Sequence, residues 1–525
     1  MNLLEQKIRN LACKKTQKVA IKSDTISLDY QNLLLEIETT CSNLGLSASS
    51  SNTSHPQFQQ KSFAFIIDNH PAWAVLDLAL LFKKQCAVPL PKFFSIEQLK
   101  HALEDSEVEF LILDESETNT QLVQALEAKV MSRESLYIAQ KRLNFYHLKK
   151  PTRPSKFSKG DWLNPNELSA VKITYTSGTT DRPKGVVLSE DVIMSKVVSL
   201  ASASEASEND ISLSILPLST LLENIAGLYV LLYCGATVTL LAPESIGLSG
   251  SSQVNQQQLF ATIEKYQPTA FIIIPQLLLL LIKMISKGYQ LPDSIRFIAM
   301  GGAPISRQLL DRAQQLKIPV FEGYGLSEAA SVVAVNNPSN NRTGSVGKVL
   351  NTHQIQIKPD KEGNEGEILI KDHLFNGYLG QQKTDPEKFY ATGDIGKLDD
   401  DGFLYITGRK KNIINTAYGR NISPEWIEKE LEAIPKIAQC LVYGHGKPYL
   451  IALLVLRDAQ SKSQELIRES LTQLNAQLPD YARVNDFILI SDPFSIQNKQ
   501  LTGTGRPRRA VIYQTYHDQL EQCYQ

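Results

Sequence analysis

The feature that most limits the fold of this 525-residue chain is a repeated alternation of short apolar runs with amphipathic stretches. Runs of this kind include FAFIID, EFLILD, AFIIIP and RFIAMGG, and each is followed by turn residues. Continuous apolar strands separated by helices indicate parallel sheets that are covered on both faces, so we predict an α/β fold. Ligands of such folds gather at the carboxyl ends of the strands, and the loops TSGTT, GGAP and GYGLSE are expected there.

A change of pattern divides the chain, which is too long for one ordinary domain. From about Ser345 the sequence alternates and carries turn signals, which indicates antiparallel β-structure. After Arg409 a hairpin, a helix, a strand and a final helix are expected, as in a compact α+β region. We therefore place the boundary at Lys410–Lys411 and predict an N-terminal domain of residues 1–410 and a C-terminal domain of residues 411–525.

The composition is that of a soluble globular protein, with 42% hydrophobic and 21% charged residues. The net charge of -1 gives no electrostatic argument for a nucleic-acid partner. The six cysteines form no CxxC pair, which indicates reduced thiols. The N-terminus lacks the apolar run of a signal peptide, and the apolar segment 270–285 is too short to span a bilayer. We predict a cytoplasmic protein without a transmembrane segment, in which 270–285 is a buried strand followed by a core helix and the polar stretches 47–61 and 140–158 are surface loops.

The stretch TYTSGTTDRPKGVVLSE, which begins at Thr174, has the residue types of a phosphate-binding loop. Glycine lets backbone N–H groups approach an anion, hydroxyl groups add donors, and Lys184 adds a positive charge. This is not a Walker loop, because Lys184 lies between proline and glycine. We expect a strand before it and a helix capped by Ser189 after it, so that Ser177–Gly185 is a strand-to-helix loop.

The segment YTSGTTDRPKG resembles the signature loop of the adenylate-forming enzymes, which include acyl-CoA synthetases, luciferases and the adenylation domains of peptide synthetases. The segments LPLSTLLEN, GGAP, GYGLSEAA, YATGDIGKLDDDGFLYITGRKKNIINTAYGRNISPEWIE and LTGTGRPRR follow in the order of that family. The resemblance implies a large N-terminal domain of two β/α layered subdomains plus a β-barrel-like part. It also implies a small, mobile α+β C-terminal domain.

The resemblance also implies roles for the matched residues, with ATP, Mg²⁺ and CoA as cofactors. The catalytic residues would be Arg506, Glu328, Lys184 and Thr176, and the metal ligands Glu328 and Thr176. Tyr324 would stack on adenine opposite Gly302, Ala303 and Pro304, while Asp394 and Arg409 would bind the ribose. The remaining cofactor-binding residues would be Ser177, Gly178, Thr179, Thr180, Gly323, Ser327 and Gly419. Lys411 would be the hinge about which the C-terminal domain turns, and this would bring the loop at Tyr418–Gly419 to the site to admit a thiol.

One departure from the family pattern lies in the C-terminal catalytic loop. Relatives read Thr-x-Thr-x-Lys in the C-terminal catalytic loop, whereas this chain has Arg506 in place of the lysine. Arginine keeps the charge but replaces a compact ammonium with a planar fork. Three interpretations stay open: Arg506 does the work of the lysine, the nearby Lys499 does it, or adenylation is weak.

Together the motifs predict an acid–thiol ligase of the AMP-forming acyl-CoA synthetase type, most like the long-chain fatty acyl-CoA synthetase branch. It would convert a fatty acid to acyl-AMP with release of pyrophosphate, and then transfer the acyl group to CoA. Thr220 stands where such enzymes usually carry a histidine or aromatic residue, which suggests a wider pocket entrance. Leu218 stands where amino-acid-activating relatives carry an aspartate, so an α-ammonium would be unpaired there.

Two alternatives remain at this stage. The acceptor could be the phosphopantetheine of an acyl carrier protein, and the basic residues Arg506, Arg508 and Arg509 suit an acidic carrier as well as the 3′-phosphate of CoA. These residues would also suit a solvated helix start. Alternatively, the chain could be a nucleotide-binding relative that has lost adenylation, for which only Arg506 is evidence.

Overall fold

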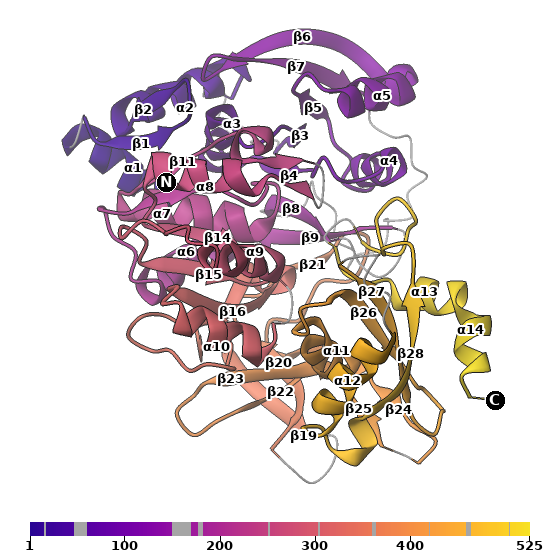
Figure 1. Cartoon of the computed structure of the whole chain (residues 1–525). Helices are drawn as coiled ribbons and strands as arrows, with labels where there is room; N and C mark the ends of the chain where they lie inside the picture. The colour runs from indigo at the N-terminus through magenta and orange to yellow at the C-terminus, as the bar shows by residue number, and fades with distance from the viewer. Residues whose placement is uncertain are drawn as a thin grey trace.

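The structure is a computed structural model that describes residues 1–14, 17–46, 60–149, 170–176, 182–249, 253–302, 305–359, 364–418, 420–457, 464–502 and 505–524. Figure 1 shows the N-terminal half as stacked sheets and helices, with the C-terminal residues beside them at the lower right. The helices of the N-terminal part pack against two sheets, one of eight and one of nine strands.

The eight-stranded sheet, called the first sheet below, has the order β21-β9-β8-β4-β3-β5-β7-β6. Strands β3, β4, β5 and β8 pair in parallel, as the apolar runs predicted. The helix α3 is buried along its length between residues of both sheets. The elements of this layer are α2 Tyr30–Asn43, β3 Ser62–Ile66, α3 Pro71–Phe82, β4 Cys86–Pro89, α4 Ile96–Asp105, β5 Phe110–Leu113, α5 Glu117–Leu126, β6 Val130–Ile138, β7 Lys141–Leu148, β8 Ala170–Thr176, β9 Lys184–Ser189 and β21 Gly377–Tyr378.

The nine-stranded sheet, called the second sheet, has the order β18-β17-β16-β15-β14-β10-β11-β1-β2. Its central strands are parallel, and the carboxyl ends of β14, β15 and β16 lead into the loops expected to bind ligand. Its elements are α1 Leu3–Lys14, β1 Val19–Lys22, β2 Ser27–Asp29, α6 Glu190–Ala203, β10 Ile211–Leu213, α7 Val230–Cys234, β11 Thr237–Thr239, β12 Leu248–Ser249, β13 Gln253–Val254, α8 Gln256–Tyr266, β14 Ala270–Ile273, α9 Pro275–Ile285, β15 Phe297–Met300, α10 Arg307–Gln315, β16 Val320–Leu326, β17 Ser331–Val335 and β18 Lys348–Val349. The strand β14 and helix α9 confirm the prediction for 270–285.

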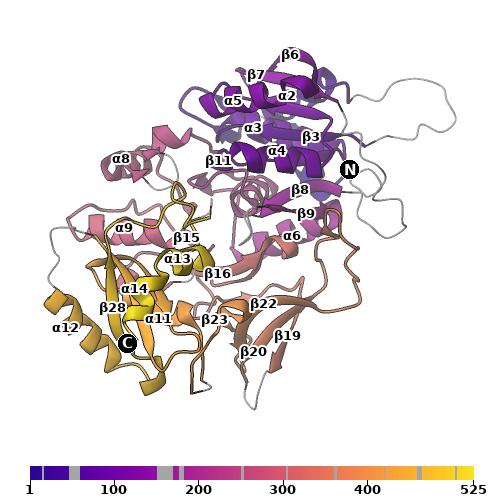
Figure 2. The same ribbon diagram turned by 90° about the vertical axis from the view of Figure 1, so that its right-hand side faces the viewer.

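The antiparallel β-structure predicted from about Ser345 onward is present. Four antiparallel strands form the sheet β19-β20-β22-β23, which Figure 2 shows below the second sheet. Their bounds are β19 Gln354–Pro359, β20 Gly366–Lys371, β22 Tyr390–Leu398 and β23 Leu404–Arg409. The C-terminal α+β region follows, with β24 Ile414–Asn415, β25 Asn421–Ile422, α11 Pro424–Glu432, β26 Ile437–Tyr443, β27 Leu450–Leu456, α12 Gln464–Asn475, β28 Val484–Ile490, α13 Arg509–Thr515 and α14 His517–Gln522. The predicted fold class is confirmed, whereas the boundary at Lys410–Lys411 and the mobility of the C-terminal domain stay predictions.

Two local predictions were wrong. The surface loop predicted at 140–158 is contradicted over residues 141–148, which form β7, pair with β5 and β6, and pack Leu143, Phe145 and Leu148 against the first sheet. Residues 150–158 of this stretch, and 47–59 of the other predicted loop, lie outside the described residues. The loop after Thr176 does not run directly into a helix. It joins β8 to the antiparallel strand β9, and only then does α6 begin, with Ser189 as its N-cap.

A buried ion pair ties β8 to α3. Lys172 Nζ lies 2.8 Å from Asp77 Oδ1, and the two side chains are 1% and 0% exposed. Asn224 and Tyr229, both on the π-helical segment Glu223–Tyr229, complete the network, since the hydroxyl of Tyr229 donates to Asp77 Oδ2. The network therefore holds the first sheet against the elements that line the second.

We expect Lys172→Met to lower the free energy of unfolding by about 3–5 kcal/mol, because it leaves the Asp77 carboxylate buried without its cation. Urea denaturation measures this change. The control Lys84→Met breaks an exposed pair with Glu190 and should change stability by at most about 1 kcal/mol. Equal small effects for both variants would contradict the assignment of Lys172 as a core ion-pair residue.

Across the described ranges, no helix has the length and apolarity needed to cross a membrane. The cytoplasmic location stays a prediction.

Candidate active site

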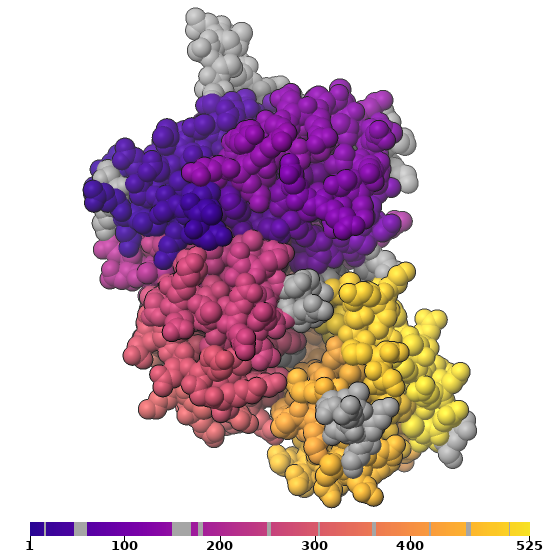
Figure 3. Space-filling view, turned by 45° about the horizontal axis from the view of Figure 1, so that its top comes forward, coloured from indigo at the N-terminus to yellow at the C-terminus, as the bar shows by residue number. Residues whose placement is uncertain are grey.

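A large cleft of about 2840 Å³ runs along the carboxyl ends of the second sheet. Its walls also include the end of β8, the strand β23 and the C-terminal region. Figure 3 shows the C-terminal residues, in orange to yellow, beside the residues of the second sheet. The motifs that are far apart in the sequence therefore meet in one cleft, at the edge of the sheet where ligands were expected.

Three of the predicted nucleotide-binding residues are in direct contact. The hydroxyl of Tyr324, on β16, donates to Asp394 Oδ2 over 2.7 Å, and Arg409 Nε lies 2.7 Å from Asp394 Oδ1. Asp394 and Arg409 face each other across the register of β22 and β23. Asp394 is 3% exposed, and its two oxygens form a fixed acceptor pair between an aromatic ring and a guanidinium.

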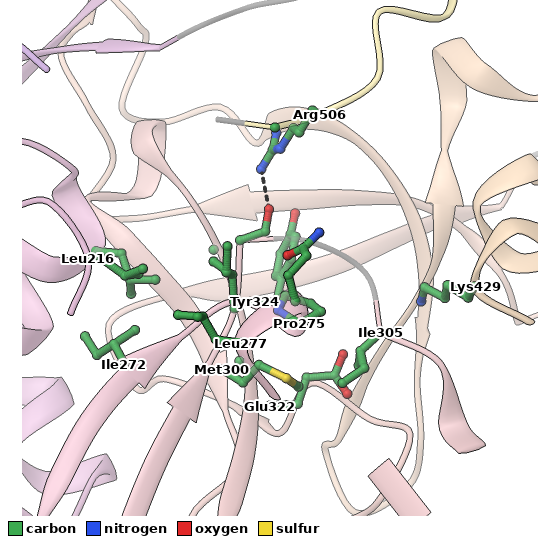
Figure 4. A pocket seen from close by; sticks show the side chains of 18 of the residues that line it. Leu216, Ile272, Pro275, Leu277, Met300, Ile305, Glu322, Tyr324, Lys429 and Arg506 are labelled. Atoms are coloured by element: carbon green, nitrogen blue, oxygen red, sulfur yellow. Dashed lines mark hydrogen bonds between the residues drawn. The ribbon is translucent and has the colours of Figure 1, made fainter. Parts of the chain in front are cut away.

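Arg506 reaches from the C-terminal region into this corner. Its Nη2 donates to the carbonyl of Gly302 over 2.9 Å, and Figure 4 shows the side chain pointing toward the second sheet. Gly302 has a φ of 85°, a conformation that favours glycine. Enclosure within the cleft and the charge of Arg409 lower the pKa of Arg506, while the carboxylates of Asp394 and Glu328 counteract this. Arg506 is thus a cation placed among the other predicted site residues.

Lys499, the alternative to Arg506, has a different position. It is exposed and, unlike Arg506, it does not belong to the described lining of the cleft. Lys411, the predicted hinge, lines the cleft, and burial and the charges of Arg409 and Arg506 lower its pKa.

The described residues predicted to bind the metal ion and the phosphates line the same cleft. Thr176 and Lys184 face each other across the β8–β9 register. Glu328 accepts a 2.5 Å hydrogen bond from the hydroxyl of Tyr378, and Lys184 Nζ lies 5.2 Å from the centre of the Tyr378 ring. Tyr378 was missed by sequence reasoning, because only the pairing of β21 with β9 brings it here.

Below the nucleotide corner the lining of the cleft is mostly apolar, with the carboxyl group of Glu322 beside Met300. Figure 4 shows Leu216, Ile272, Leu277 and Met300 around this part, which we call the apolar chamber. Thr220 lines the cleft, and its hydroxyl donates to the carbonyl of Pro217; its effect on the pocket entrance stays a prediction. Leu218 packs in the core instead and is absent from the described lining, so its alignment with a substrate-binding aspartate gives no information about the pocket.

Glu223 also lines the cleft, and its burial was not predicted from the sequence. Glu223 is 1% exposed. Burial raises the pKa of its carboxyl group to about 8, although hydrogen bonds from Ser214 and from the backbone of Leu216 act to lower that pKa. A Cβ on Gly227 would lie 2.5 Å from Glu223 Oε1, so the π-helical segment makes room for the side chain only through this glycine. At neutral pH the group is therefore mainly uncharged, which is compatible with the neighbouring apolar chamber.

The basic residues predicted to suit an acceptor have different partners in the structure. Arg509 forms a two-pronged ion pair with Glu428 of α11, at 2.7 and 2.5 Å, and is partly buried. Arg508 and Arg509 both line the cleft. The ion pair between Arg509 and Glu428 thus anchors α13 to α11.

Some predicted residues lie outside the described residues: Ser177, Gly178, Thr179, Thr180, Ala303, Pro304 and Gly419. Gly323 and Ser327, by contrast, line the cleft beside Tyr324 and Glu328.

The donor groups fit the expected cofactors. Asp394 offers two carboxylate oxygens to a diol, and Tyr324 offers an aromatic face beside it. Glu328 offers a carboxylate oxygen, the ligand type that Mg²⁺ prefers, close to Lys184, which suits phosphate.

Comparison with known proteins agrees with this geometry. Residues 54–379 match the family described as AMP-binding enzyme, and residues 411–525 match the AMP-binding enzyme C-terminal domain. A long-chain-fatty-acid–CoA ligase, ACSBG2 of Xenopus laevis, is 27% identical over 87% of this chain and 75% of its own length. The long-chain-fatty-acid–CoA ligase FadD15 of Mycobacterium bovis is 27% identical over 86% of each chain.

The solved structures include o-succinylbenzoate coenzyme A synthetase of Bacillus subtilis in complex with ATP and magnesium ion. It has a TM-score of 0.72 and 22% identity, over 97% of this chain and 98% of the other.

The chain belongs to the AMP-binding enzyme family, and the predicted adenylate-forming class is confirmed. It is an AMP-forming acid–thiol ligase. Its relatives are named as CoA ligases, and the similar Bacillus subtilis structure holds ATP and magnesium ion, which agrees with the cofactors expected here.

Proposed function

We propose that the protein activates a fatty acid with ATP and transfers the acyl group to the thiol of CoA. The observation that carries this proposal is the continuous cleft, in which a polar corner around Asp394 and Glu328 opens onto the apolar chamber, with Arg506 near the junction. The two curated relatives, both named as long-chain-fatty-acid–CoA ligases, support it.

The apolar chamber supports a hydrocarbon substrate. Leu216, Ile272, Leu277 and Met300 are apolar, and burial raises the pKa of the two carboxyl groups nearby, Glu223 to about 8 and Glu322 to about 7. Burial of each methylene group there would stabilise the complex by about 0.8 kcal/mol. Thr220 at the cleft wall leaves more room than the larger residue expected at this position.

In the first half-reaction a substrate carboxylate oxygen bonds to the α-phosphorus of ATP, and the bond between that phosphorus and the bridging oxygen breaks to release pyrophosphate. The main requirement is positive charge where these anions meet. We assign this charge to Arg506 and Lys184, while Asp394, Arg409 and Tyr324 orient the nucleoside. Mg²⁺, held by Glu328 and Thr176, would neutralise phosphate charge.

In the second half-reaction the thiol sulfur bonds to the acyl carbon, its proton is lost, and AMP leaves with the oxygen. The arrangement of the C-terminal region supports the first step in this structure, because Arg506 contacts Gly302 whereas Tyr418 is 77% exposed. We infer that the domain of residues 411–525 turns about Lys411 between the steps, which would bring Tyr418 and Gly419 to the cleft.

The test of this function is thioester formation from ATP, Mg²⁺ and a panel of acids that includes palmitate, octanoate, benzoate and o-succinylbenzoate. Each acid is tested with CoA and with a phosphopantetheinylated acyl carrier protein, and acyl thioesters are detected by mass spectrometry. We expect palmitoyl-CoA as the main product. A preference for an aromatic acid, or transfer only to the carrier protein, would overturn the proposed substrate or the proposed acceptor.

A further inference from the structure

We propose that Tyr378 is a positioning residue of the metal and phosphate site, one that sets the orientation of both Glu328 and Lys184. This inference rests on the proposed function, in which Glu328 binds Mg²⁺ and Lys184 binds phosphate.

The contacts of Tyr378 join parts of the chain that are far apart in sequence. Its hydroxyl donates to Glu328 Oε1 over 2.5 Å and lies 3.2 Å from the hydroxyl of Tyr390. Its ring faces Lys184 Nζ, at 5.2 Å from the ring centre. Phe375 packs edge-on against both tyrosine rings, which fixes the plane of Tyr378.

The backbone on either side of Tyr378 is hydrogen-bonded near the two residues that its side chain contacts, Glu328 and Lys184. The N–H of Phe375 donates to the carbonyl of Glu328 over 2.8 Å, and the N–H of Leu379 donates to the carbonyl of Gly185 over 2.9 Å. Between them, β21 pairs with β9 next to Lys184. The segment Phe375–Leu379 is therefore a strap that connects the strand after the phosphate loop with the predicted metal ligand.

This arrangement has a chemical consequence for Glu328. The hydrogen bond from Tyr378 occupies Oε1, whereas Oε2 accepts no hydrogen bond from the described residues. A carboxylate held by one oxygen cannot rotate freely, which favours metal binding by the other.

The ring has a separate effect on Lys184. A cation over an aromatic face is attracted to it, and this keeps the ammonium near the end of β8, opposite Thr176. Tyr378 thus offers two interactions that single substitutions can separate, since phenylalanine keeps the ring and removes only the hydroxyl.

The test measures binding of the non-hydrolysable analogue α,β-methylene-ATP to the full chain by calorimetry, with excess Mg²⁺ and with EDTA. For Tyr378→Phe we expect roughly 10–100-fold weaker binding with Mg²⁺ and no change with EDTA, the range found when the partner of a metal ligand is removed. Tyr378→Leu should weaken binding under both conditions, because it also removes the ring beneath Lys184. Tyr390→Phe, the matched control, should keep the Mg²⁺ dependence, since the bond between Tyr378 and Glu328 remains.

A double-mutant cycle with Glu328→Gln distinguishes positioning from a general structural effect. If Tyr378 acts through Glu328, Tyr378→Phe should have little further effect in the Glu328→Gln background. Equal losses in both backgrounds, or unchanged Mg²⁺ dependence in Tyr378→Phe, would overturn the inference. Failure of the wild-type chain to bind the analogue at all would instead contradict the proposed function.

Discussion

Replacing Arg506 with alanine is expected to lower the rate of acid-dependent pyrophosphate exchange by roughly 10²–10³-fold, the loss typical when one charge-stabilising donor is removed from an active site. Arg506 contacts Gly302 across the cleft and lies among Arg409, Asp394 and Glu328, so its charge is available where the substrate carboxylate and the α-phosphate would meet. Exchange kinetics with a fatty acid and saturating ATP measure the effect.

Two variants complete this experiment. Arg506→Lys keeps the charge and should retain more activity than the alanine variant. Lys499→Ala is the matched control and should leave exchange unchanged, because Lys499 is not part of the described cleft lining. The reverse pattern, with activity lost in Lys499→Ala and kept in Arg506→Ala, would assign the catalytic cation to Lys499.

The second large effect is expected for Asp394→Asn, which should weaken AMP binding about 10–100-fold. The buried carboxylate holds both Tyr324 and Arg409, and an amide has only one acceptor oxygen and no charge. A hydrogen bond to a charged group contributes about 1.5–3 kcal/mol, and each 1.4 kcal/mol is about tenfold in affinity. Calorimetric titration with AMP measures the change.

The control for Asp394 is Asp399→Asn. Asp399 lies just after β22, the strand of Asp394, and pairs with Arg342 at the protein surface. AMP affinity should not change in this variant. If both variants bind AMP as the wild type does, Asp394 is not a ribose ligand.

The layered fold could be predicted from the sequence because its strands are continuous apolar runs. The runs that became β3, β5, β14 and β15 are buried on both faces, and this burial leaves a direct pattern in the sequence. The strand β7 was missed because the polar residue Asn144 is buried between Leu143 and Phe145, so the polar positions of the sequence do not coincide with the exposed ones. The strand β9 was missed because glycine and hydroxyl residues in the phosphate loop dominate the local signal.

The site residues could be predicted where they belong to a motif, as Tyr324, Asp394, Arg409 and Arg506 do. What the sequence could not show is which side chains meet through tertiary contacts. Tyr378 reaches Glu328 only because β21 pairs with β9, and Glu223 is mainly uncharged only because the surrounding core removes it from water. For Leu218 the alignment was misleading, because it placed this residue in the substrate pocket whereas the side chain packs in the core.

The most direct test of the account is acid-dependent exchange of radioactive pyrophosphate into ATP by the wild-type chain, without a thiol. The account predicts exchange that requires Mg²⁺ and a fatty acid such as palmitate. No exchange with any acid in the panel, from a protein that still binds ATP, would contradict the claim that this cleft forms an acyl adenylate.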